Sequence, residues 1–174
     1  NDEVKAGFVT MVAANYLKPK ESPDAWVVEV VNTMKMGDCD KLEKLLTSFF
    51  ASIPYSQRRK DDEREKERYF QYTFYLVIRM ISSFTVLIEK EQSEGRVDCI
   101  IETPMFVYIF EFKRDGSATE ALKQIEEKGY AREYATDNRM IYMIGCNFSS
   151  KTGTIDDWKS KGENLRKLSD FSDK

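Results

Sequence analysis

Three charged residues, Asp98, Glu111 and Lys113, stand at a spacing that could form a hydrolytic centre. Carboxylate oxygens are the ligands that hard divalent cations such as Mg²⁺ prefer, and a nearby lysine ammonium can orient water and stabilise anionic charge. The chain contains no histidine, and its three cysteines form no C-x-x-C pair. These absences exclude histidine-based triads and most zinc sites. Catalysis would therefore use carboxylates, lysine or hydroxyl groups.

The two carboxylates lie on neighbouring predicted strands, residues 96–102 and 105–113, joined by a turn at 103–104. With that turn, Asp98 lies opposite Ile109 and on the same face as Glu111 and Lys113. Diagonal neighbours of this kind have backbones roughly 7–8 Å apart and could share one cation. The second strand is apolar on both faces before Glu111, which is typical of a central strand. The alternative is that Glu111 and Lys113 emerge at an exposed strand end, or that the three charges form a structural ion-pair cluster.

Other patterns predict the elements around these strands. A strand is expected at 85–91, and Ser117 with Glu120 forms a capping box for a helix that ends at Gly129. A strand at 139–148 then makes a strand–helix–strand crossover, so strands 105–113 and 139–148 should be parallel neighbours. Helices are expected at 24–36, at 40–50 and from the charge run 57–68 to about 83, and a weak, fraying helix in the polar tail 151–174.

Composition limits the class of protein. The chain has 174 residues, of which 41% are apolar and 33% charged, so it can bury a core and keep a polar surface. It has no apolar stretch near the ~20 residues that a membrane span needs, and no apolar leader at its start. Reduced cysteines favour the cytoplasm. Since the chain does not begin with methionine, we expect a fragment of a longer protein.

The wider sequence around the three charged residues is similar to that of one known family. The matching motifs are Ser52-Ile53-Pro54-Tyr55, Glu67-Arg68-Tyr69-Phe70, Gly95-Arg96-Val97-Asp98, Ile100-Ile101-Glu102-Thr103-Pro104, Tyr108 to Lys113, Ala121 to Ile125 and Lys128-Gly129-Tyr130-Ala131. Together they resemble the PD-(D/E)XK nuclease superfamily, in the branch of prokaryotic proteins in which this domain follows an AAA-ATPase-like region. The resemblance implies an α/β fold with a restriction-endonuclease-like core, in which helices flank a mixed central sheet of about four to five strands, preceded by a small helical segment.

The same resemblance implies a domain organisation. Residues 1–56 correspond to a helical linker at the end of the ATPase-like region, 57–160 to the nuclease-like domain, and 161–174 to a polar tail.

The resemblance also implies roles for individual residues. Asp98, Glu111 and the Phe112 carbonyl would hold Mg²⁺, for which Mn²⁺ could substitute, and Lys113 would orient or deprotonate the attacking water. Glu67 matches an acidic residue of the first core helix, and the alternative is a solvated charge. Gln124 matches a helix glutamine that faces the site, with a surface position as the alternative. Tyr130 could contact a phosphate or serve only in packing.

The implied substrate is nucleic acid, DNA in particular, although the net charge of −3 shows no global basic field. The candidate cations for phosphate contacts are Arg58, Arg59, Lys60, Arg114 and Lys123. Arg114 is the best of them because it adjoins Lys113. Two alternatives stay open: a catalytically silent nuclease-fold module that regulates an ATPase-like neighbour, and a nucleotide-hydrolysing enzyme. A Gly-rich phosphate loop is missing from the sequence, which disfavours the latter.

Overall fold

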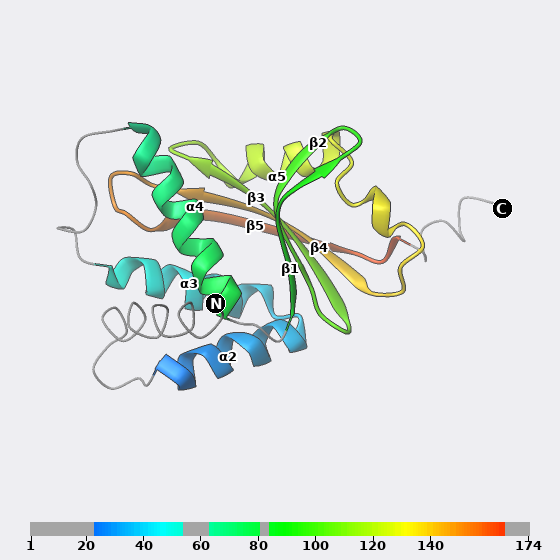
Figure 1. The fold of residues 1–174 in the computed structure, drawn as a ribbon, viewed down its shortest axis with the longest axis horizontal. Helices are drawn as coiled ribbons and strands as arrows, with labels where there is room; N and C mark the ends of the chain where they lie inside the picture. The colour runs from blue at the N-terminus through cyan, green and yellow to red at the C-terminus, as the bar shows by residue number, and fades with distance from the viewer. Residues whose placement is uncertain (1–22, 54–62, 81–83, 166–174) are drawn as a thin grey trace, which may run out of the picture. The chain divides into compact units, whose positions relative to one another are not determined.

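The computed structural model describes residues 23–53, 63–80 and 84–165, which divide into two units. The first contains helices α2 (Pro23–Met36), α3 (Cys39–Ser52) and α4 (Glu63–Met80). The second contains helix α5 (Ala118–Glu127) and most of a five-stranded sheet (Figure 1). Among the helices of these residues, none has the length and apolar character needed to cross a membrane.

The helical unit follows the expected pattern. Gly37, with a φ of 72°, ends α2, and the Asp38 side chain caps α3 by accepting a hydrogen bond of 2.9 Å from the Lys41 backbone N–H. The apolar stripe of α3 is buried, as are Phe70, Phe74 and Ile78 of α4. The three helices predicted between residues 24 and 83 are therefore confirmed. The first six residues of the charge run, 57–62, lie outside the described residues.

The sheet has the strand order β1–β2–β3–β4–β5. The strands are β1 (Thr85–Gln92), β2 (Gly95–Glu102), β3 (Phe106–Arg114), β4 (Met140–Phe148) and β5 (Ile155–Glu163). β1 pairs with β2 and β2 with β3 in antiparallel fashion, whereas β3 and β4 are parallel and are connected through α5. The mixed sheet and the parallel crossover are thus confirmed.

The prediction of a weak helix in the tail is wrong, because residues 155–163 form the edge strand β5. Its large apolar side chains are those of Ile155, which is buried, and Trp158, whose ring packs edge-on against Phe110 at a centroid distance of 5.9 Å. The rest of the strand is polar, and Lys161 pairs with Glu126 of α5 at 2.8 Å. A charged edge strand blocks pairing with other chains, and for that reason it has little hydrophobic signal.

The predicted register of β2 and β3 is wrong by two residues. The Thr103 backbone N–H donates to the Phe106 carbonyl at 2.8 Å, and the Thr103 hydroxyl accepts the Phe106 N–H at 2.9 Å, so Pro104 and Met105 form the turn. Moving the turn by one residue moves the pairing by two, and Ile100 now lies opposite Ile109. Because side chains alternate with a period of two, the predicted face of every residue is unchanged.

Helix α5 lies close to β4 and is capped from two sides. The Ser117 side chain and Glu120 form the predicted capping box, and Asp157 of β5 accepts a hydrogen bond of 2.8 Å from the Ala118 N–H. Gly145 of β4 faces this helix, and a Cβ atom there would lie 2.1 Å from the Ala118 carbonyl oxygen. Gly145 is also the β4 partner of Glu111, so the missing side chain brings α5 next to Glu111.

Candidate active site

Glu111 is the most deeply buried carboxylate of the described residues. Its side chain comes from the central strand β3 and is 3% exposed. The Gln124 side-chain amide of α5 donates to Oε1, whereas the buried Oε2 has no hydrogen-bond partner among the described residues. Burial and, secondly, the nearby Asp98 raise the pKa of Glu111 to about 8. An unsatisfied carboxylate oxygen at this depth is unfavourable unless something else binds it.

Asp98 stands where β2 and β3 separate. The paired residues of these strands end at Cys99 and Phe110, and continuing the register by one step sets Asp98 opposite Glu111. At this point the Asp98 side chain replaces the backbone of β2 as the hydrogen-bond partner of β3, since its Oδ2 accepts the Phe112 backbone N–H at 2.8 Å. Burial raises the pKa of Asp98, against the opposing effects of this hydrogen bond and of Lys113. The two carboxylates are therefore direct rather than diagonal neighbours.

Lys113 and Gln124 complete the constellation. Lys113 lies two residues beyond Glu111 on β3, and its Nζ donates to the Gln124 Oε1 at 2.5 Å. The amide of Gln124 thus links the lysine ammonium on one side to the Glu111 carboxylate on the other. The structure brings Asp98, Glu111, Lys113 and Gln124 together around one end of β3. It also makes Gln124 half-buried, in contrast to the surface alternative.

The donor set fits a hard divalent cation. Asp98 and Glu111 both have raised pKa values, and a cation between them would favour the ionised form of each. In an extended strand the N–H and C=O groups of one residue point to the same edge. Because the Phe112 N–H points to Asp98, its carbonyl points toward the same side. No cluster of three acidic, histidine or cysteine side chains is found among the described residues, so the carboxylates form a pair.

The other predicted site residues have different surroundings. The Glu67 backbone belongs to α4, but its side chain lies outside the described residues, as do Arg58, Arg59 and Lys60. The Arg114 side chain is 20% exposed, and its Nε lies 3.7 Å from Asp115. Tyr130 is 2% exposed and its hydroxyl donates to the Arg96 carbonyl at 3.0 Å. Burial raises the pKa of Tyr130. Lys123 is exposed and pairs with Glu127.

Sequence reasoning missed two charges beside Asp98. Glu89 of β1 lies between the pairs Ile88–Cys99 and Lys90–Val97, opposite Asp98, and has a positive φ of 50°. Arg96 lies two residues before Asp98 and 4.0 Å from Glu89. Alternation along β2 places Arg96 on the face of Asp98 and was the available signal.

The support of the loop after β3 was also missed. Asn147, the β4 partner of Lys113, is 3% exposed and accepts the Gly116 N–H at 2.9 Å. A polar side chain near the end of an otherwise apolar strand was the signal in this case.

Comparison with known proteins agrees with this architecture. The PD-(D/E)XK nuclease superfamily matches residues 65–158, which include every strand except the end of β5. A protein of Azotobacter chroococcum mcd 1, described as an uncharacterized protein in the vnfD 5' region, is 31% identical over 157 residues, 89% of this chain. The chain spans 30% of the length of that relative. No solved structure matches the chain.

The match covers the strands, the crossover helix and the charged residues at the end of β3. The mixed five-stranded sheet with α5 packed against β3 and β4 is consistent with the restriction-endonuclease-like fold of the superfamily, whose nucleases generally use divalent metals. The chain belongs to the PD-(D/E)XK nuclease superfamily.

Proposed function

We propose that this domain is a Mg²⁺-dependent nuclease that hydrolyses phosphodiester bonds of DNA. The observation that carries the proposal is the buried Glu111 Oε2, which has no hydrogen-bond partner in the part of the chain that the structure describes, although Asp98 and Lys113 lie beside it. A retired site would be free to replace a buried, unsatisfied carboxylate with an apolar side chain, which is often the more stable choice.

The cation would be held by Asp98, by Glu111 and by the Phe112 carbonyl. When bound, it would supply positive charge that stabilises the phosphate and lowers the pKa of water. The raised pKa values of the two carboxylates support this assignment, because burial disfavours the ionised form of each and a bound cation would favour it.

The protein groups would then divide the remaining work. Lys113 would orient the attacking water and stabilise negative charge on the phosphate, and Gln124 would hold the ammonium in place through the 2.5 Å contact. The water oxygen forms the new bond to phosphorus, the ester bond on the opposite side breaks, and the leaving oxygen ends with a proton. Arg114 would contact the backbone of DNA, and Tyr130 lies close enough to Gln124 and Asp98 to affect the site.

We further propose that the domain works in the cytoplasm beside an ATPase-like region of a longer chain. The length of the Azotobacter relative, of which this chain spans 30%, supports a larger protein. The alternative is a regulatory module that has kept the nuclease fold and lost the reaction. That alternative predicts a protein whose biological activity does not depend on Lys113.

Titration of Mn²⁺ into the protein, followed by calorimetry, tests the proposal without a guess about the substrate. We expect saturable binding to the wild-type chain and loss of it in Asp98→Asn, which keeps the size of the side chain and removes its charge. Binding of equal strength in both proteins, or none to the wild type up to millimolar ion, would contradict the metal site. With binding established, cleavage of single- and double-stranded DNA and of RNA by wild type and Lys113→Ala identifies the substrate.

A further inference from the structure

Asp98 lies on the part of β2 that no longer pairs with β3. β2 and β3 run side by side near their turn and diverge toward the β1–β2 turn (Figure 1), in agreement with the last paired residues at Cys99 and Phe110. At residues 95–98, β1 is the one neighbouring strand of β2 in the described sheet. A two-stranded hairpin by itself is marginally stable. The backbone of Asp98 therefore needs support that β3 does not give.

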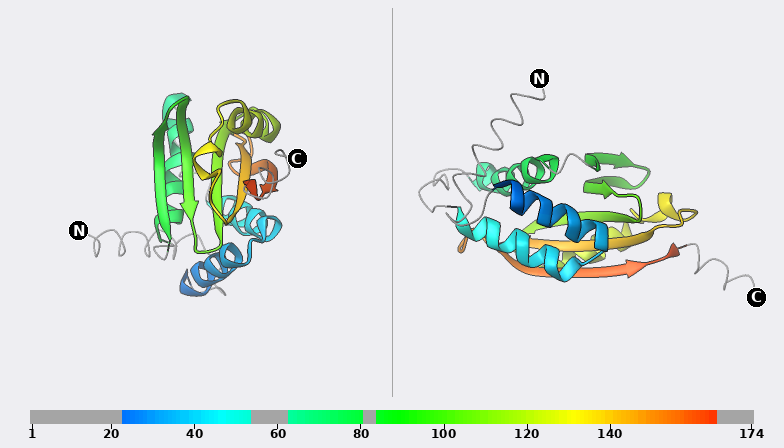
Figure 2. Two further views of the ribbon diagram at one scale, coloured as in Figure 1. Left: turned by 90° about the vertical axis from the view of Figure 1, so that its right-hand side faces the viewer. Right: turned by 90° about the horizontal axis from the view of Figure 1, so that it is seen from below.

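That support comes from the segment 129–134, which follows α5. In the left view of Figure 2 this segment, drawn in yellow, lies between the β1–β2 hairpin and the rest of the sheet. Lys90 of the hairpin pairs with Glu133 at 2.5 Å, and Arg132 forms an ion pair with Glu94. These ion pairs are partly exposed and contribute little each.

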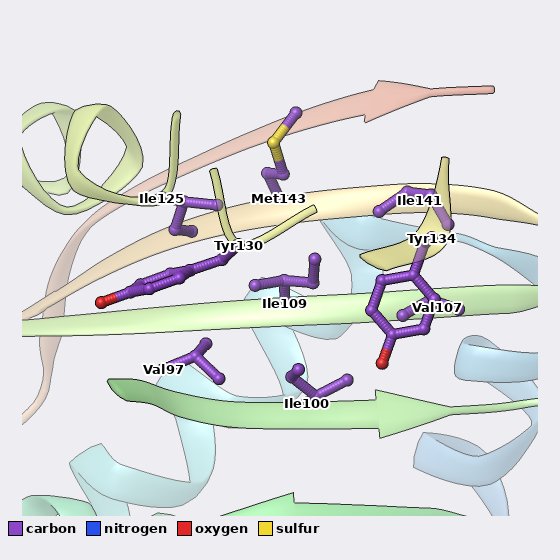
Figure 3. Packing of buried hydrophobic residues seen from close by; sticks show 9 residues of the cluster. All are labelled: Val97, Ile100, Val107, Ile109, Ile125, Tyr130, Tyr134, Ile141 and Met143. Carbon is purple, nitrogen blue, oxygen red and sulfur yellow. The ribbon is translucent and has the colours of Figure 1, made fainter. Parts of the chain in front are cut away.

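Tyr130 makes the buried contacts of this segment. Its carbonyl accepts a hydrogen bond of 3.3 Å from the Gln92 side chain, and its hydroxyl donates to the Arg96 carbonyl at 3.0 Å. The ring lies in the apolar cluster that includes Val97, Ile109 and Ile125, and its hydroxyl points toward the hairpin (Figure 3). The Tyr130 ring therefore lies in the core, while its hydroxyl binds the backbone of Arg96, two residues before Asp98.

Gly95 shows how closely the hairpin approaches this ring. Its φ is 156°, and a Cβ atom built there would lie 3.0 Å from the Tyr130 hydroxyl oxygen. A side chain at this position would push the hairpin away from the phenol. The absence of one allows the backbone at residues 95–96 to rest on the Tyr130 ring, and the hydrogen bond to Arg96 fixes its orientation.

We infer that Tyr130 is a positioning residue, which holds the β1–β2 hairpin so that the Asp98 carboxylate meets Glu111. Tyr130 acts on the hairpin backbone and through it on Asp98. The inference rests on the proposed function, since it assigns to Tyr130 a role in building the cation site. Residues that support metal ligands commonly change metal affinity by 10–100-fold when they are altered.

Tyr134 provides a matched control within the same segment. It belongs to the same apolar cluster, and its hydroxyl also donates to β2, to the Glu102 carboxylate at 3.1 Å. Glu102 lies four residues beyond Asp98, in the part of β2 that is paired with β3. Tyr130→Phe and Tyr134→Phe each remove one hydroxyl from one buried ring. A purely structural role predicts similar consequences for the two variants.

Amide hydrogen exchange in EDTA tests the inference without any metal. We expect Tyr130→Phe to increase exchange at residues 96–98 at least fivefold while β3 and β4 exchange as in the wild type. Tyr134→Phe should leave residues 96–98 unchanged. Equal protection of residues 96–98 in wild type and Tyr130→Phe would overturn the inference.

The second measurement is Mn²⁺ affinity by calorimetry. We expect affinity about tenfold weaker in Tyr130→Phe and unchanged in Tyr134→Phe, with similar melting temperatures for the two variants. If the wild type binds Mn²⁺ and both variants bind it equally well, the inference fails and the proposed function stands. If the wild type binds no Mn²⁺, the proposed function fails, and the exchange measurement alone decides whether Tyr130 holds the hairpin.

Discussion

Strand β2 carries a carboxylate toward each of its ends, and the protein surrounds the two in opposite ways. At one end, Glu102 accepts from Arg139 at 2.9 Å, and the same guanidinium pairs with Asp137 at 2.6 Å and donates to the Thr103 carbonyl. Toward the other end, Asp98 and Glu111 face each other, and no described residue hydrogen-bonds to the Glu111 Oε2.

The pKa values report the same contrast. Hydrogen bonds from Arg139 lower the pKa of Asp137, and those to Asp137 and Glu102 raise the pKa of Arg139. Burial raises the pKa values of Asp98 and Glu111 instead. The Arg139 group is an ion-pair network in which the opposite charges are paired, whereas the Asp98–Glu111 pair brings together two buried like charges. Perturbation in this direction, beside a lysine, is typical of a functional site.

The largest expected effect separates the two groups by activity. Lys113→Ala should lower the rate of DNA cleavage by about 10²–10³-fold, because it removes the positive charge that would stabilise the phosphate. Its unfolding free energy should change little, since the half-buried side chain forms no ion pair with a carboxylate of the described residues. Lys161→Ala is the matched control and should keep full activity. It removes an ammonium of β5 that pairs with Glu126 of α5 and with Glu163 of β5. Full activity in Lys113→Ala would leave only the silent-module alternative.

The pH dependence of stability is the next largest effect. The folded pKa of Glu111, about 8, lies above its usual value of 4.5, so the folded protein holds this proton where the unfolded chain has lost it. The free energy of unfolding in EDTA should therefore fall by roughly 2–4 kcal/mol between pH 4.5 and pH 8 and level off above that. Urea denaturation of wild type and Glu111→Gln measures it.

Two outcomes of that measurement test the cause. Glu111→Gln should be nearly insensitive to pH over this range and more stable than wild type at pH 8.5, because it buries no charge. Saturating Mn²⁺ should reverse the slope for the wild type, since a cation binds the ionised pair. A wild-type slope that Glu111→Gln retains would assign the titration to another group.

Arg139→Ala should act in the opposite direction from Glu111→Gln. It leaves Glu102 and Asp137 without their shared cation, and we expect a loss of about 2 kcal/mol. The value is below that of a fully buried pair, because these side chains are 21–25% exposed. Urea denaturation at pH 8 with Arg132→Ala as control, whose ion pair with Glu94 is more exposed, gives the comparison. A loss no greater than that of Arg132→Ala would show that the network is not stabilising.

The Asp98–Glu111 side of this contrast could be predicted from the sequence because of periodicity, whereas the Arg139 network was not predicted. Alternation along β2 and β3 placed Asp98, Glu111 and Lys113 on one face, and a register error of two residues preserved that face. The turn itself was misplaced because the Thr103 hydroxyl takes part in it, a contact that hydrophobic patterns do not encode.

Long-range contacts explain what the sequence left open. The link from Lys113 through Gln124 to Glu111 depends on the distance between α5 and β4, which Gly145 sets, and the sequence indicates neither the packing nor the close approach. Strand β5 was missed because its contacts are the packing of Trp158 on Phe110 and one ion pair and two hydrogen bonds to α5, which its own hydrophobic pattern does not indicate.

The smallest expected effect concerns Arg114, at the end of β3 that carries Glu111 and Lys113. Arg114 follows Lys113 at the end of β3 and is 20% exposed, with Asp115 as a neighbour at 3.7 Å. If it neutralises one phosphate, Arg114→Ala should weaken DNA binding by less than about tenfold and reduce the slope of log K against log salt by about one. Binding should be measured with Ca²⁺ in place of Mg²⁺ across a salt series. Lys123→Ala is the control, because Lys123 is more exposed and already pairs with Glu127 on α5. An unchanged slope for Arg114→Ala would show that Arg114 does not contact a phosphate. Lys113 would then be the remaining cation at this end of β3 for the phosphate, and further phosphate contacts would have to come from other residues.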